Sequence, residues 1–171
     1  MTECIQDSFL FASVGTREVV ARFDGGAVVS DGGALLLGEV ERQTGLLQRL
    51  AACFHDQRDP VRIEHTVEQL VRQRIYALAL GYEDLNDHDR LRHDPLIAAL
   101  CGKLEPTQDL LAGKSTLNRL ELTRPLAEAG QRRYQRILFH PELADQLLVQ
   151  LYVEAHTAPP TEIVLDLDAT R

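Results

Sequence analysis

The sequence has 171 residues, the size of one ordinary domain. Apolar residues make up 44% and charged residues 26%, which excludes a disordered chain, a collagen and a low-complexity polymer. The formal net charge of -8 argues against a surface that grips nucleic acid everywhere, but it leaves room for one basic face. No apolar run reaches the roughly 20 residues that cross a bilayer, and Glu3 and Asp7 are untypical of a secretory signal. We therefore expect a cytoplasmic protein.

The three cysteines, Cys4, Cys53 and Cys101, lie far apart and form no Cys-x-x-Cys pair. This spacing excludes a zinc ribbon and a thioredoxin-like site, so we expect reduced thiols.

The first elements are a hairpin and a helix. β-Branched residues on both sides of Asp24-Gly25-Gly26 predict a β-hairpin within residues 18–31. The leucines that follow predict a helix that ends at Gly45, with Ser30 or Asp31 as its N-cap.

The middle of the chain is expected to be helical. Apolar residues recur most clearly at helical spacing over residues 64–80, and Gly81 ends that helix. Ser115 or Thr116 is the expected N-cap of a later helix over 115–122. Residues 102–113 are expected to be a loop. The other helices are expected over residues 46–54, from near Asp87 with a break or a new start at Pro95, over 125–139 and over 141–156.

The C-terminal residues differ in character. Residues 157–161 contain two prolines and predict a linker, and residues 162–168 read EIVLDLD and predict a strand. Because a lone strand cannot form a stable sheet, we expect it to be the first strand of a truncated α/β domain. The expected organisation is a mostly helical domain with a small β-hairpin over 1–156, a linker over 157–161 and the start of the truncated domain over 162–171.

Two carboxylates share one face of that last strand. Asp166 and Asp168 are two residues apart, so their side chains point the same way. Carboxylates at a strand end are suitable ligands for Mg²⁺ or Mn²⁺ in two-metal phosphoryl chemistry. The alternative is that both acids solvate the tip of the strand.

A basic segment covers residues 112–136. It holds six basic and two acidic residues, which gives +4 within a chain of -8. Helix N-termini and basic side chains bind phosphate, so we expect nucleic-acid contact here; the alternative is a solvated helix face. The run Gly113-Lys114-Ser115 resembles the end of a nucleotide-binding loop, but Gln108 stands where that loop needs glycine. The residues expected to contact DNA are Lys114, Ser115, Thr116 and Arg119.

Residues 81–89 form an acid-rich turn. Its carboxylates and His88 suggest a metal loop, but N-capping and ion pairs with Arg90 and Arg92 explain them more simply.

Taken in order, these motifs resemble bacterial insertion-sequence transposases of the DDE group 1 class. The resemblance covers nearly the whole chain, and its most specific block is residues 81–92. The motifs are FDGG at 23–26, SDGG at 30–33, DQRD at 56–59, GYEDLNDHDRLR at 81–92, STLNRLE at 115–121 and LDLDAT at 165–170.

The resemblance implies an RNase H-like catalytic domain that begins at the strand ending in Asp168. In such transposases an Asp, an Asp and a Glu hold two Mg²⁺ or Mn²⁺ ions, which activate water or a 3′-hydroxyl for attack on DNA. By the family pattern the first acid is Asp168, with Asp166 as the alternative, and no position here matches the other two. Arg171 stands where family members usually carry an acid.

We therefore expect the N-terminal portion of a DNA transposase, inactive alone, near the bacterial nucleoid. Its expected partners are double-stranded DNA of the element's terminal repeats and a second copy of the chain. The rival hypothesis is a non-enzymatic remnant that binds DNA or a protein, the latter through an apolar stripe of Leu143, Leu147, Leu148, Leu151 and Val153.

Overall fold

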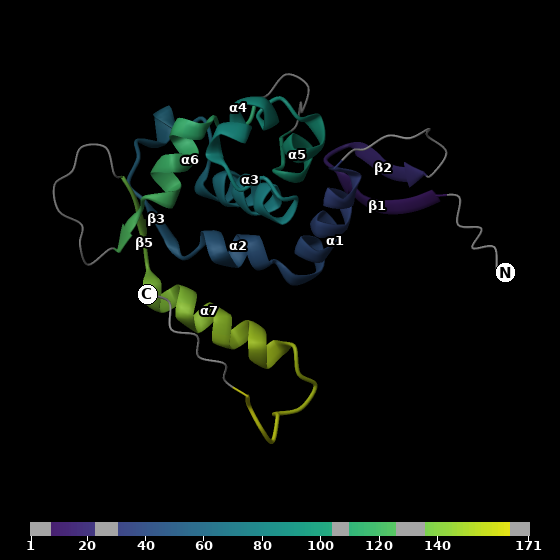
Figure 1. Ribbon diagram of the computed structural model, residues 1–171, viewed down its shortest axis with the longest axis vertical. Coiled ribbons are helices and arrows are strands. Elements are labelled where there is room, and N and C mark those ends of the chain that lie inside the picture. Colours follow the sequence, from purple (N-terminus) through teal and green to yellow (C-terminus); the bar gives the residue numbers. More distant parts are fainter. Residues whose placement is uncertain (1–7, 23–30, 104–109, 126–135, 165–171) are drawn as a thin grey trace.

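The computed structural model describes residues 8–22, 31–103, 110–125 and 136–164. Over these residues the protein is mainly helical and has two small sheets, as Figure 1 shows. The α-helices are α1 (Ala34–Thr44), α2 (Leu46–Ala51), α3 (Val67–Ala79), α4 (His88–Leu91), α5 (Pro95–Leu100), α6 (Lys114–Glu121) and α7 (Pro141–Glu154). The 3-10 turns are η1 (Asp31–Gly33), η2 (Pro60–Arg62) and η3 (Leu85–Asp87), and the strands are β1 (Ser8–Val14), β2 (Arg17–Arg22), β3 (Phe54–Asp56), β4 (Arg124–Pro125) and β5 (Ile137–Phe139).

Helix α3 lies at the centre of the fold. Its N-terminus carries a capping box, in which Thr66 and Gln69 each accept a hydrogen bond from the other's backbone N–H. The chain leaves the helix at Gly81, whose φ of 90° is open to glycine and strained for other residues. Side chains of α3 belong to both buried apolar clusters of the core, so the predicted helix over 64–80 is confirmed as the main packing element.

The hairpin differs from the predicted one. Strands β1 and β2 pair antiparallel, and Gly15, with a φ of 61°, and Thr16 form the turn between them. The predicted strand before Asp24 is therefore present as β2, but the partner it has in the structure is β1. The residues from 23 to 30, which include the predicted turn, lie outside the described residues.

The second sheet corrects two helix predictions. Strand β5 pairs antiparallel with β3 and parallel with β4. The predicted helix over 125–139 is wrong at both described ends, because Pro125 lies in β4 and Ile137–Phe139 form β5. Phe54 was expected to end a helix but instead packs on Phe139 with 5.1 Å between ring centroids. Pairing between distant segments outweighs local helical preference here.

Three of the predicted helix boundaries are confirmed. Gly45 ends α1 in the left-handed conformation, and Pro95 begins α5 behind Asp94, whose carboxylate accepts from the N–H groups of Leu96 and Ile97. Pro141 begins α7.

The predicted side-chain caps of two helices are wrong where they can be checked. Gly33 and Gly113 occupy the N-cap positions of α1 and α6, and neither helix has a side-chain cap. Asp31 instead accepts a hydrogen bond of 2.9 Å from the Tyr82 hydroxyl, which joins η1 to the loop after α3.

The apolar stripe on α7 does not act as one unit. Leu147 is buried and Leu151 is half-buried, whereas Leu143, Leu148 and Val153 are exposed. The helix lies against α2, where Arg49 forms an ion pair with Glu154 at 2.7 Å.

Residues 157–164 form no helix or strand. The first three residues of the predicted strand, from 162 to 164, are exposed and irregular, and the rest of that strand lies outside the described residues. Among the helices that the structure describes, none is long and apolar enough to cross a membrane.

A buried amide joins three helices. Gln73 on α3 is 1% exposed, and its side chain both donates to the Ala112 carbonyl at 2.8 Å and accepts from the Ala112 N–H at 3.0 Å. Its amide nitrogen also lies 3.1 Å from His88 Nδ1 at the start of α4. This Gln73 clamp fixes the residues just before α6 and the first turn of α4 against α3.

We expect Gln73→Leu to lower the free energy of unfolding by about 2–4 kcal/mol, because both backbone groups of Ala112 lose their buried partner. Urea unfolding followed by circular dichroism measures the change. The matched control is Gln48→Leu, at an exposed position on α2, which should change stability by no more than about 0.5 kcal/mol. A loss below about 1 kcal/mol for Gln73→Leu would contradict the clamp.

Candidate nucleic-acid interface

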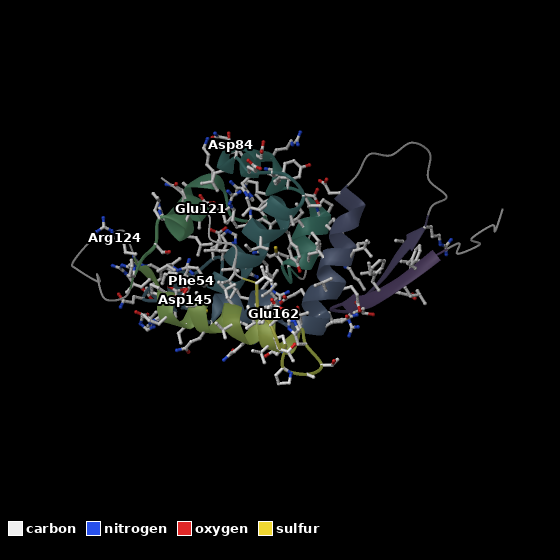
Figure 2. The ribbon with its side chains drawn as sticks, turned by 60° about the horizontal axis from the view of Figure 1, so that its bottom comes forward. Phe54, Asp84, Glu121, Arg124, Asp145 and Glu162 are labelled. Carbon is white, nitrogen blue, oxygen red and sulfur yellow. The ribbon has the colours of Figure 1, made fainter. Side chains whose placement is uncertain are left out.

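Arg74 fixes the acid-rich turn to α6. It lies on α3 and is 8% exposed, and its guanidinium forms an ion pair with Glu121 at the end of α6. The same group donates to the carbonyls of Tyr82 at 3.1 Å and Glu83 at 2.7 Å. Figure 2 labels Glu121 on α6 and Asp84 in the turn that Arg74 holds. A single residue of α3 thus holds both the turn and the end of α6.

The acid-rich turn works mainly through caps. The Asp84 carboxylate accepts from the Asn86 N–H at 2.8 Å and caps η3. Hydrogen bonds from the Asn86 backbone and side chain lower the pKa of Asp84, and the nearby Lys114 charge adds to the effect. N-capping, expected from the sequence, is confirmed here.

The ion pair of this turn is not the predicted one. Asp89 pairs with Lys114 at 3.0 Å, and Lys114 also donates to the Asn86 side chain at 3.1 Å. Over the described residues, no carboxylate pairs with Arg90 or Arg92. Part of the positive charge expected for DNA is therefore neutralised by the turn.

The four expected DNA contacts all lie on α6. Its buried side chains, Leu117 and Leu120, face the core, so the opposite side of the helix is open to solvent. Lys114, Ser115 and Arg119 are exposed and Thr116 is half-buried. In the described part of the chain Arg119 has no ion-pair partner.

The rest of the basic segment is only partly described. Arg124 is half-buried and Arg136 is exposed, while Arg132 and Arg133 lie outside the described residues. Residues 110–113, directly before α6, form no strand, so a nucleotide-binding loop gains no support.

One cation was assigned to the wrong partner by sequence reasoning. Arg92 directly follows α4, and its guanidinium lies against Gly113, the residue before α6. The sequence feature that points to this contact is Gly113, which by itself matches only part of a nucleotide-binding pattern.

The residues expected to bind metal do not lie in this region. In the stretches that the structure describes, no three His, Cys, Asp or Glu side chains are grouped so that they could hold a metal ion. The two carboxylates expected to bind metal, Asp166 and Asp168, lie outside the described residues.

Comparison with known proteins decides the family. The family model of the transposase DDE domain group 1 matches residues 11–171. The chain belongs to this transposase family. No curated protein and no solved structure matches it. Transposases of this kind serve DNA transposition, so DNA is a partner, and the family generally uses divalent metal ions.

The most specific block of the resemblance is a structural joint of this transposase. Within residues 81–92, Tyr82 bonds Asp31 through its hydroxyl and Arg74 through its carbonyl, and His88 contacts Gln73. These contacts connect the start of α1, the middle of α3 and the start of α4. The block therefore organises the helices around α6.

Two buried histidines make the stability of this domain depend on pH. His88 is fully buried and His65 is 6% exposed, and burial lowers the pKa of each below the ordinary 6.5. Nearby cations, Arg74 for His88 and Lys103 for His65, act in the same direction. Below pH 6.5 the unfolded chain therefore binds protons that the folded chain does not.

We expect the free energy of unfolding to fall as the pH decreases from about 7.5 to about 5.5. Urea titrations at several pH values measure this slope. His88→Gln should flatten it, because that position no longer binds a proton in the unfolded chain. His93→Gln, at an exposed position nearby, is the control and should leave the slope as it is. Equal slopes for wild type and His88→Gln would be the contrary result.

Proposed function

We propose that this chain provides the DNA-binding domain of a DDE transposase and the first strand of its catalytic domain. Residues 1–156 form the DNA-binding domain, residues 157–161 a linker, and residues 162–171 the first strand of an RNase H-like domain. The family match over residues 11–171 is the observation that carries this proposal. The motif LDLDAT at 165–170, which contains the expected first acid, supports the assignment of the last segment.

The proposed catalytic acid is Asp168, with Asp166 as the alternative. Carboxylate oxygens are hard ligands that suit Mg²⁺ and Mn²⁺, the ions that activate water or a 3′-hydroxyl in two-metal phosphoryl transfer. One strand cannot surround two metal ions, so the other acids of the site come from outside residues 162–171. By this proposal residues 162–171 cannot cleave DNA alone.

The proposed DNA contacts are the exposed residues of α6. Arg119 carries a charge that no described carboxylate neutralises, and Ser115 and Thr116 lie in the first turn of the helix, where phosphate binds well. Lys114 contributes once it leaves Asp89, an exposed ion pair that holds it only weakly. The proposed duplex is the terminal repeat of the element that encodes the transposase.

We expect the double substitution Lys114→Glu plus Arg119→Glu to weaken binding of a terminal-repeat duplex by at least tenfold at about 0.1 M salt, because two phosphate contacts become repulsive. Fluorescence anisotropy over a salt series measures affinity and salt slope. Arg42→Glu plus Arg62→Glu makes the same change of charge at exposed positions on α1 and η2 and should have a much smaller effect. Equal losses for the two double variants would rule out a specific role for α6.

A second test addresses the acid. The assay measures excision of the element by the whole transposase that the element encodes. We expect Asp168→Asn to abolish excision, because the amide cannot hold the metal as a carboxylate does. Glu162→Gln removes one acid six residues earlier and serves as the control, with excision retained. Loss with Asp166→Asn and full activity with Asp168→Asn would instead identify Asp166 as the acid.

A further inference from the structure

Arg92 is a cation whose guanidinium lies close to the start of α6. Its Nε atom is buried and makes no hydrogen bond, and within the described residues no carboxylate pairs with its guanidinium. Its backbone is fixed, because the Arg92 carbonyl accepts from the Leu111 N–H at 3.0 Å. A guanidinium keeps its charge at every ordinary pH, and a partly desolvated charge gains from a counter-charge. Arg92 as a whole is half-buried, so an anion can reach the exposed atoms of its guanidinium.

Lys103 adds positive charge to the surroundings of Arg92, because both cations lie near the buried ring of His65. His65 is 6% exposed, and Lys103 Nζ lies 3.4 Å from its Nδ1, so the ammonium group donates to a neutral imidazole. The charges of Lys103, Arg92 and Arg58 all lower the pKa of His65. Two acids offset these charges only in part. Asp56 is bound to Arg58 at 2.7 Å, and Glu64 is 3.7 Å from His65 with a side chain that is 80% exposed.

Gly113 is what lets Arg92 reach α6. A Cβ atom at this position would lie 3.3 Å from Arg92 Nη1, so a side chain here would push the guanidinium away by a few tenths of an ångström. Helix α6 has no side-chain cap, and its N-terminus carries the positive end of the helix dipole. Arg92 and the first turn of α6 thus present positive charge to the same place, and Ser115, exposed in that turn, is one of the proposed DNA contacts.

We propose that Arg92 binds one backbone phosphate of DNA and so sets the position of α6 on the duplex, while Lys103 adds positive charge to the surroundings. This inference rests on the proposed function and adds a residue on another element to its contact surface. A planar guanidinium binds a phosphate through two parallel hydrogen bonds, and such contacts fix orientation without reading sequence. Arg92 is accordingly a positioning residue for the bases or phosphates that α6 contacts.

The test measures binding of a terminal-repeat duplex to the 171-residue chain by fluorescence anisotropy over a salt series. We expect Arg92→Ala to weaken binding about tenfold and to reduce the salt slope by about one phosphate, with partial recovery in Arg92→Lys. Arg90→Ala removes an exposed arginine two residues earlier on α4 and should stay within about twofold of wild type.

A pair of glycine variants tests geometry at constant charge. Gly113→Ala places a methyl group 3.3 Å from Arg92 Nη1 and pushes the guanidinium by a few tenths of an ångström, so it should weaken duplex binding modestly. Gly33→Ala, where nothing lies within 4 Å of the new methyl group, should not weaken it. This pair also decides the question if Arg92→Ala fails to fold by circular dichroism.

The remaining outcomes separate this inference from the proposed function. Duplex binding that is equally strong in wild type, Arg92→Ala and Gly113→Ala overturns the inference and leaves DNA binding by α6 intact. No duplex binding by the wild type overturns both. Inorganic pyrophosphate serves as the second probe, measured by calorimetry. If pyrophosphate binding is lost in Arg92→Ala while duplex binding is unchanged, the site takes a free phosphate compound, and the proposal for DNA is wrong.

Discussion

The fold depends on two polar side chains, Gln73 and Arg74, that are buried on α3. Gln73 holds the backbone before α6, and Arg74 holds the turn after α3 together with the last residue of α6. A buried amide or guanidinium is stable only when its partners are in place, so each of these contacts penalises every other arrangement of the helices. Apolar packing makes the domain compact, and these hydrogen bonds determine which loop meets which helix.

This arrangement explains what the acid-rich turn does in the fold. Its carboxylates are turned toward backbone N–H groups and toward Lys114, and the structure holds no grouping of metal ligands among the residues it describes. A sequence pattern that is specific to a family can thus reflect the contacts by which its helices pack together. The turn also neutralises part of the positive charge at the start of α6, through the ion pair of Asp89 with Lys114.

The sequence was most informative where local signals decide the structure. Helical periodicity and glycine stops predicted α1 and α3, and prolines predicted the starts of α5 and α7, because these features act within one or two turns. The short strands β3 and β5 could not be predicted, since three residues carry almost no periodicity and their pairing joins positions more than eighty residues apart. The same limit applies to the candidate interface. The residues of α6 were found from charge and spacing, but the approach of Arg92 to Gly113 depends on how two separate loops meet.

The hairpin has a different relation to the rest of the molecule. Figure 1 shows β1 and β2 at one side of the helices, with α1 as their neighbour. A cavity of about 380 Å³ lies where the hairpin faces α1, and it is lined by Phe11, Val19, Leu35 and Tyr76 among others. A two-stranded ribbon over an incompletely filled space has little to hold it down. Amide hydrogens of the hairpin should therefore exchange with solvent through local opening, long before those of α3, and the domain would lose its N-terminal strands as a separate step while the helical framework around α6 stays intact.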